Sequence, residues 1–466
     1  MPVYDVVITN SHVVLPNGIV EKNIVIDNGK IALFTNDIPS CDRKINASGL
    51  ISIPGVIDPH VHYGVYSPIK HAAITESSVA AIGGITSIMR MFRTIRSYKD
   101  ILHKHISASS NYHYVDYSMH ASIFNQQQVN EMKYCVDHNI TSFKLYMNLG
   151  SHIGKIHMDM DDPIINSLQE TTVEVNYELI KNVIQKASSL HCPVLIHAED
   201  YVTCYNNETK AKSKNLDGLK TWSTCRSAES EAIAIKNVCK LARDFNCTLY
   251  FVHIGSILAM TQILHEKDKG TKIYTETCPH YLKLSYDKHH NYNAKVMPPI
   301  RSINDIQHIW NSIRDNNIDT IGTDHVANRS DLKIGHNIWT TLAGFPGLGT
   351  SLSILLSEGI NKNRISLSQL VNITSTNTAK IFGMYPIKGS MQKNADADIT
   401  IIDLKKEMKV KNISFHGHSD YNVYDNMILQ GWPVKTLLRG ELIAENFEIV
   451  GKLGSGKIID RHITKY

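Results

Sequence analysis

Strand-like and helix-like patterns of hydrophobic residues alternate through the middle of the chain, from about residue 54 to residue 383. Short apolar runs typical of buried strands occupy residues 50–57, 85–91, 115–123, 140–147, 193–198, 249–254, 272–277 and 318–322. Between them apolar residues recur at helical spacing, most clearly at Leu179, Ile180, Val183, Ile184 and Ala187. Eight strand–helix units in a row predict an α/β fold, a parallel (β/α)8 barrel of the TIM type. An open doubly wound sheet is the alternative, which the lack of a glycine-rich phosphate loop after an early strand disfavours.

Both ends of the chain show a different pattern, in which short β-rich runs alternate with turn residues. Such runs occupy residues 4–9, 19–26, 30–34, 397–403, 434–438, 440–444 and 447–450. Because chain ends often lie close together, we expect both ends to form one small β-sandwich. The predicted domains are residues 1–53 (first part of the sandwich), 54–383 (barrel) and 384–466 (second part of the sandwich and C-terminal tail).

The composition indicates a soluble globular protein, with 42% hydrophobic and 20% charged residues among 466. A formal net charge of +4 is small for this length, and no basic run is interleaved with aromatics, so we expect no nucleic-acid partner. The 8 cysteines are scattered without a Cys-x-x-Cys pair, which favours reduced thiols in the cytoplasm. No secretory signal and no apolar stretch long enough to cross a bilayer is visible, so no membrane partner is expected either.

Candidate metal ligands stand at the ends of the predicted barrel strands. The first strand ends in His60 and His62, which point to the same side because residues two apart on a strand share a face. Later strand ends add four candidates: Lys144, His197, His253 and Asp324. Each of these residues taken alone could have a purely structural role, such as that of a hydrogen-bonded core histidine or a surface lysine. All six at strand ends, where barrels of this type keep their working residues, predict a metal centre.

Lys144 needs a chemical reason to stand beside metal ions. An ammonium close to two divalent cations is strongly disfavoured, so the lysine should become neutral there. A neutral amine adds carbon dioxide and becomes a carbamate, an anion able to bridge two metals. We therefore expect carbon dioxide to be fixed as a carbamate on Lys144.

With these residues the chain resembles the amidohydrolase superfamily, in particular its cyclic amidohydrolases: hydantoinases and dihydropyrimidinases, allantoinases and dihydroorotases. The resemblance covers nearly the whole chain and includes residues 276–282 (ETCPHYL), 298–301 (PPIR), 344–347 (GFPG), 374–383 (TSTNTAKIFG) and 396–399 (DADI). It implies one divalent metal bound by His60, His62 and Asp324, and a second bound by His197 and His253. It also implies that carboxylated Lys144 and a hydroxide bridge the metals, with zinc the expected ion. Asp324 would then pass a proton from the attacking hydroxide to the leaving ring nitrogen.

Four positions depart from what this resemblance leads us to expect. Gly64 stands where dihydroorotases carry an arginine, and Asn328 stands where they often carry a histidine. Met297 replaces a polar residue that contacts the substrate in relatives. Leu149 replaces a tyrosine that helps to stabilise the oxyanion in typical hydantoinases. These changes leave the metal ligands intact, so we expect them to alter the substrate and not the reaction.

Arg93 takes the place of a site-facing asparagine that relatives often carry after the second strand. Since a guanidinium binds carboxylates in a bidentate way, Arg93 is a candidate contact for an anionic substrate group. The alternative is a surface arginine in a run with Arg90 and Arg96. The long polar segment 150–172 also has two interpretations, a lid over the site or an insertion without a catalytic role.

The predicted function is binuclear metal-dependent hydrolysis of the C–N bond in a small cyclic amide or ureide. Hydantoin and dihydropyrimidine rings are favoured, although residues 278–282 look more like allantoinases and dihydroorotases, which stay as alternatives. A non-catalytic scaffold relative is the alternative from another class, and it is disfavoured because such proteins have lost metal ligands. A deaminase-like enzyme with one metal does not require Lys144. Relatives are usually oligomers, so a homodimer or homotetramer is expected.

Overall fold

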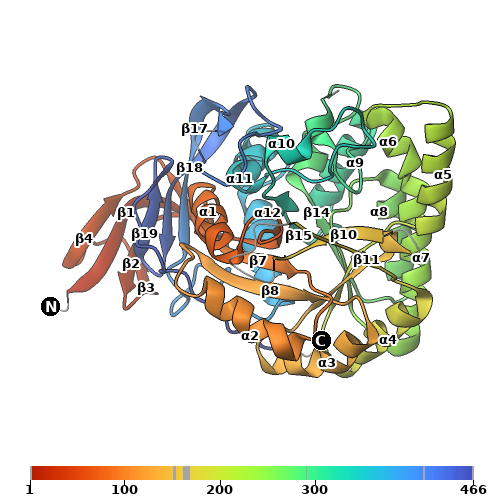
Figure 1. The fold of residues 1–466 in the computed structure, drawn as a ribbon. Coiled ribbons are helices and arrows are strands. Elements are labelled where there is room, and N and C mark those ends of the chain that lie inside the picture. The colour runs from red at the N-terminus through yellow and green to blue at the C-terminus, as the bar shows by residue number, and fades with distance from the viewer. Residues whose placement is uncertain (1–2, 151–153, 161–167, 290, 413–414, 464–466) are drawn as a thin grey trace.

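The computed structural model describes residues 3–150, 154–160, 168–289, 291–412 and 415–463 (Figure 1). Its central part is a curled parallel sheet in the order β15-β14-β13-β12-β9-β8-β7-β6-β16. The strands are β6 Val56–His62, β7 Ile85–Phe92, β8 Asp116–Ser122, β9 Phe143–Tyr146, β12 Val194–His197, β13 Leu249–Phe251, β14 Ile273–Thr277, β15 Thr320–Ile321 and β16 His325–Val326.

A split last strand joins the two edges of this sheet. β15 pairs with β14 and β16 pairs with β6, and only residues 322–324 separate the two short strands. Gly322 has no room for a side chain, since a Cβ there would lie 2.6 Å from Glu276 Oε2 and 2.8 Å from His60 Cβ. The predicted (β/α)8 barrel is thereby confirmed, with a bend at its eighth strand that brings residue 324 to the rim.

Amphipathic helices cover the outside of the barrel (Figure 1). They include α1 Ile69–Ile82, α2 Tyr98–Ser109, α3 Gln126–Asp137, α4 Tyr177–Ser189, α5 Tyr201–Ser213, α6 Leu219–Cys225, α7 Ala228–Phe245, α8 Ile257–Asp268 and α9 Ile303–Arg314. α4 buries the five apolar residues that its spacing predicted, and Asn176 caps its first turn through the Leu179 amide. The shorter helices α10 Ser330–Lys333, α11 Ser351–Ile354, α12 Leu367–Val371 and α13 Asn377–Ile381 follow the last barrel strand.

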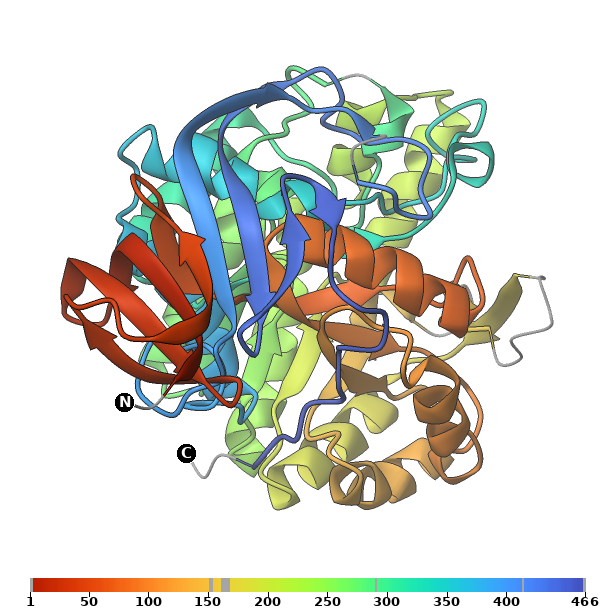
Figure 2. The same ribbon diagram turned by 90° about the vertical axis from the view of Figure 1, so that its left-hand side faces the viewer.

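Both chain ends contribute to a second, mainly antiparallel sheet, as the β-rich patterns predicted. Its order is β20-β19-β18-β17-β5-β1-β2-β3, with β4 also paired to β1. The strands are β1 Tyr4–Leu15, β2 Gly18–Asp27, β3 Lys30–Thr35, β4 Cys41–Asn46, β5 Ile51–Pro54, β17 Ile399–Lys409, β18 Ile428–Leu438, β19 Glu441–Glu445 and β20 Glu448–Ile449. Figure 2 shows these two groups of strands side by side, and residues from both groups share one hydrophobic core.

The apolar run 50–57 is not the single strand that its pattern predicted. β5 belongs to the end sheet, where it pairs with β1 and β17, whereas β6 opens the barrel. Gly55 lies between them, and a Cβ there would lie 2.1 Å from Thr86 Oγ1. A continuous apolar run does not reveal this change of partner, because both strands are buried.

The C-terminal segment crosses the end of the barrel opposite the strand ends that carry the candidate ligands (Figure 2). Tyr117, near the start of β8, donates its amide to Lys457 O at 3.0 Å and accepts the Ile459 amide at 2.8 Å. Arg461 is buried there and donates to Ser142 Oγ at 3.0 Å. Among the residues described, none of the helices has the length and apolar character needed to span a bilayer.

Candidate metal centre and substrate pocket

Three of the predicted ligands meet at the end of β6. His60 Nε2 and His62 Nε2 are 3.2 Å apart, and Asp324 Oδ1 lies 3.2 Å from the first and 3.1 Å from the second. Asp324 reaches them from the bend between β15 and β16, where its φ of 50° is unusual for a residue with a side chain. Two imidazole nitrogens and one carboxylate oxygen at such distances are a donor set suited to a zinc-like ion.

Two further histidines meet beside this group. His197 Nδ1, at the end of β12, lies 2.9 Å from His253 Nε2, and their ring centroids are 4.5 Å apart. The ring of His253 also lies 5.5 Å from that of His60, so the two groups of ligands are neighbours. His253 follows β13 with a φ of 45°, a second strained backbone position in the site.

Lys144, the second residue of β9, completes the set. Its side chain is fully buried, and its Nζ has no hydrogen-bond partner among the described residues. Burial lowers the pKa of this ammonium to about 7, although Glu276 and Asp324 oppose the shift. An amine with this pKa is about half neutral at pH 7, and the neutral amine is the species that attacks carbon dioxide.

Two buried carboxylates hold the histidines, and the sequence analysis assigned neither of them a role. Glu276 Oε1 lies 2.8 Å from His60 Nδ1 and accepts the His253 amide at 3.0 Å. Glu199 Oε2 lies 2.6 Å from His197 Nε2. In both histidines the carboxylate engages one ring nitrogen and leaves the other facing the ligand cluster, the arrangement that orients metal-binding imidazoles.

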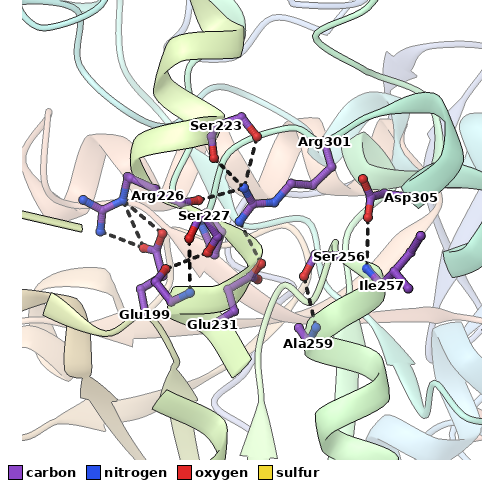
Figure 3. A network of polar contacts seen from close by, with 12 residues as sticks. Glu199, Ser223, Arg226, Ser227, Glu231, Ser256, Ile257, Ala259, Arg301 and Asp305 are labelled. Atoms are coloured by element: carbon purple, nitrogen blue, oxygen red, sulfur yellow. Dashed lines mark hydrogen bonds and ion pairs between the residues drawn. The ribbon is translucent and has the colours of Figure 1, made fainter. Parts of the chain in front are cut away.

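Glu199 is itself held by a buried network (Figure 3). Arg226 donates to Glu199 Oε2 at 2.7 Å, and Arg301 donates to the Arg226 carbonyl oxygen at 2.7 Å and to Glu231 at 2.7 Å. Burial alone would raise the pKa of Glu199, but Arg226 and His197 lower it to about 2. The PPIR motif at residues 298–301 thus supports His197 through Arg301 and Arg226.

Burial favours the neutral form of the four histidines predicted to be ligands. Burial lowers the pKa of His60 to about 3, and burial also lowers the pKa values of His62, His197 and His253. Neutral imidazole is the form that binds metal ions, so burial prepares all four rings for that role. Burial raises the pKa of Glu276 to about 8.

A cavity of about 110 Å³ opens onto all six predicted ligands. Its remaining wall is formed by Tyr66, Arg93, Tyr146, Asn148, Leu149, Ile156, Val296, Met297, Val326, Ala343 and Gly344. Arg93 and Met297, two of the tentative substrate contacts, therefore lie in this wall. Asn328 does not line the cavity: it donates to the carbonyl oxygen of Gly344 at 3.3 Å and accepts a hydrogen bond from Tyr421 at 2.6 Å.

The three arginines near the end of β7 have different surroundings. Arg90 is buried and donates to Asp159 at 3.0 Å, whereas Arg96 is exposed. Arg93 faces the cavity, its Nε is buried without a partner, and no acidic side chain in the described part of the chain pairs with it. The three do not form one surface run.

Part of segment 150–172 forms a wall of the cavity. β10 Gly154–Met158 and β11 Gln169–Val173 make an antiparallel hairpin, and Ile156 lines the cavity. Beyond β10, the Asp159 amide donates to Arg93 O at 2.9 Å and the Met160 amide donates to Gly64 O at 2.8 Å. Residues 151–153 and 161–167 of the segment lie outside the described residues.

Comparison with known proteins gives matches over the whole chain. The model of the amidohydrolase family matches residues 51–443. An L-hydantoinase of Paenarthrobacter aurescens is 28% identical over 98% of both chains, and a D-hydantoinase of Geobacillus stearothermophilus is 30% identical over 97% of this chain and 96% of its own. Among solved structures, a dihydropyrimidinase from Brevibacillus agri superposes with a TM-score of 0.88, 26% identity and 99% coverage of each chain. The similarity thus includes both chain ends as well as the barrel.

Proposed function

Because this chain belongs to the amidohydrolase family, we propose that it hydrolyses the C–N bond of a cyclic amide or ureide at a centre of two divalent metal ions. The observation that carries the proposal is the opening of one cavity onto six side chains: His60, His62, Lys144, His197, His253 and Asp324. A non-catalytic scaffold would have no need of this set. A deaminase-like enzyme with one metal would have no need of the buried lysine.

The donor atoms fit two metal ions. We assign one to His60 Nε2, His62 Nε2 and Asp324 Oδ1, and the other to His197 Nδ1 and His253 Nε2. Bound there, divalent ions such as zinc would lower the pKa of a water molecule and polarise the amide carbonyl. The unpartnered Nζ of Lys144 supports its conversion to a carbamate, in which the amine adds carbon dioxide and releases one proton.

Asp324 is the proposed proton carrier. Its carboxylate accepts the proton of the attacking water and returns it to the ring nitrogen when the C–N bond breaks. The bend between β15 and β16 holds Oδ1 about equally far from His60 and His62, at 3.2 and 3.1 Å. The product is an open chain with a new carboxylate, and for a hydantoin or dihydropyrimidine ring the released nitrogen becomes the NH2 of a carbamoyl group.

We propose hydantoin or dihydropyrimidine rings as substrates, since the relatives named above are hydantoinases and a dihydropyrimidinase. Allantoin and dihydroorotate are the alternatives. Arg93 favours a ring with an anionic group, because its guanidinium faces the cavity and has no acidic partner among the described residues. Met297 offers an apolar contact to the ring, and Asn328 acts only through the backbone of Gly344.

The proposal is tested by hydrolysis of hydantoin, dihydrouracil, allantoin and dihydroorotate with zinc-loaded protein. We expect ring opening of at least one ring, fastest for hydantoin or dihydrouracil, and about two zinc ions per chain. A matched Lys144→Gln variant should lose both activity and zinc. A protein that holds two zinc ions but opens none of the four rings would contradict the proposal.

We also propose a cytoplasmic homodimer or homotetramer. Support for the compartment comes from the cysteines, all 8 of which are free thiols. Light scattering after gel filtration measures the mass directly, and a mass of 52.4 kDa would identify a monomer.

A further inference from the structure

Tyr146 lines the cavity and carries a buried hydroxyl group. It is the last residue of β9 and stands two residues after Lys144, so both side chains point to the inside of the barrel. The ring is only 6% exposed and is fixed by its neighbours. It stacks on Phe124 with centroids 5.6 Å apart and lies 6.3 Å from the ring of His197.

The hydroxyl of Tyr146 is buried, and its only hydrogen-bonding neighbour among the described residues is the Ser122 hydroxyl. The Ser122 hydroxyl has no other partner there. Buried hydroxyl groups nearly always have a hydrogen-bond partner, because moving a hydroxyl group out of water without a new hydrogen bond lowers the stability of the protein. The Ser122 hydroxyl can donate to the oxygen of Tyr146, which leaves the phenol O–H free to donate to a ligand in the cavity that this ring lines.

Amide hydrolysis creates a need for such a group. When water adds to the carbonyl carbon, the carbonyl oxygen becomes negatively charged, and hydrogen-bond donors aimed at it lower the barrier. Much of the wall away from the metal ligands is apolar, including Leu149, Ile156 and Met297. Tyr146 supplies a neutral O–H donor from a rigid strand end, next to the lysine and the histidines.

We propose that Tyr146 is a catalytic residue whose hydroxyl donates a hydrogen bond to the scissile carbonyl oxygen as that oxygen becomes an oxyanion. This inference rests on the proposed function. It goes beyond the metal ligands and beyond Asp324, because it assigns the oxyanion contact to a side chain that no metal requires.

The test compares Tyr146→Phe with the wild type on the ring that the wild type opens fastest. The substitution removes one oxygen atom and keeps the ring that stacks on Phe124. We expect kcat to fall about 100-fold or more, with KM changed less than about threefold and the zinc content unchanged. The matched control is Tyr134→Phe, which removes a phenol from a half-buried ring of α3 on the outside of the barrel and should change kcat less than about threefold.

A second measurement is the binding of a ring analogue with tetrahedral phosphorus in place of the scissile carbonyl carbon. Tyr146→Phe should weaken it by about the same factor as kcat/KM falls. An unchanged kcat would overturn the proposal. A loss of zinc in proportion to activity would also overturn it, since the hydroxyl would then support carboxylated Lys144. A large fall in Tm would overturn it as well, since the hydroxyl would then have a structural partner. A wild type that opens no ring would instead refute the proposed function.

Discussion

Replacing Glu276 by glutamine should stabilise the metal-free protein at high pH and weaken its binding of zinc. Glu276 Oε1 accepts the His253 amide at 3.0 Å and lies 2.8 Å from His60 Nδ1, and Oε2 accepts the Tyr250 hydroxyl at 2.8 Å. A glutamine keeps its oxygen toward the two histidines and turns its amide group to Tyr250, whose hydroxyl also contacts Thr320 at 2.6 Å. The shape and most hydrogen bonds survive, so the variant chiefly removes the negative charge.

The size of the effect on the metal-free protein follows from the pKa of Glu276. Burial raises this pKa from 4.5 to about 8, so the folded state favours the protonated acid. The unfolded chain releases the proton near pH 4.5, and stability is therefore lost as the pH rises from about 4.5 to about 8. Between pH 5 and pH 8 the loss amounts to roughly 3 kcal/mol. Glutamine does not ionise, so the variant should be about as stable as the wild type at pH 5 and roughly 3 kcal/mol more stable at pH 8.

Thermal unfolding of chelator-treated protein measures this difference. For 466 residues, an unfolding entropy of about 2.1 cal/mol/K per residue converts 1 kcal/mol into about 1 °C, so Tm of the variant should exceed that of the wild type by about 3 °C at pH 8. With saturating zinc this advantage should shrink to less than about 2 °C, because the weaker partner of His60 should lower zinc affinity by about 10- to 100-fold, which costs about 1.4 to 2.7 kcal/mol.

The matched control is Glu266→Gln, which removes a buried carboxylate paired with Arg243 and Lys269 on the barrel exterior. Burial alone would raise the pKa of Glu266, but its hydrogen bond to Arg243 and its other contacts lower it. This variant should therefore be less stable than the wild type at pH 8 and should bind zinc normally. A Tm difference for Glu276→Gln that does not change between pH 5 and pH 8 would refute the reasoning.

Three further outcomes follow from the site. Lys144→Ala should lower kcat by more than about 1000-fold, and elemental analysis should find the zinc content reduced as well. Gly322→Ala places a Cβ 2.8 Å from His60 Cβ, so kcat should fall at least about tenfold in a steady-state assay; unchanged kcat would show that the bend tolerates a side chain. Arg93→Ala should raise KM for dihydroorotate at least about tenfold and leave KM for hydantoin unchanged, whereas the control Arg96→Ala should change neither. Equal effects of Arg93→Ala on both rings would argue against an anion contact.

The sequence was sufficient to predict where the ligand side chains lie, for a simple physical reason. The strands of a parallel barrel all end at the same rim, so residues that follow apolar runs, such as His197 and His253, must be neighbours. The pattern could not show that Gly55 separates two strands of different sheets, since both are buried. It also gave no role to Glu199, although a carboxylate two residues after His197 was a usable signal.

Other features depend on contacts that only the folded chain defines. Asn328 follows the Asp324 strand end closely enough to suggest a substrate contact, but its side chain turns to Gly344 and Tyr421. The sequence likewise does not show that the Tyr146 hydroxyl has only the Ser122 hydroxyl beside it among the described residues. Hydrogen-bond satisfaction is a property of the packed site and not of the local pattern.

Anomalous X-ray diffraction at the zinc edge, from crystals of the zinc-loaded protein grown with bicarbonate, tests the central claim most directly. We expect two zinc peaks, one bounded by His60, His62 and Asp324 and the other by His197 and His253, with three extra atoms of a carbamate on Lys144 between them. A single peak, or an unmodified Lys144 amine beside the ions, would contradict the account.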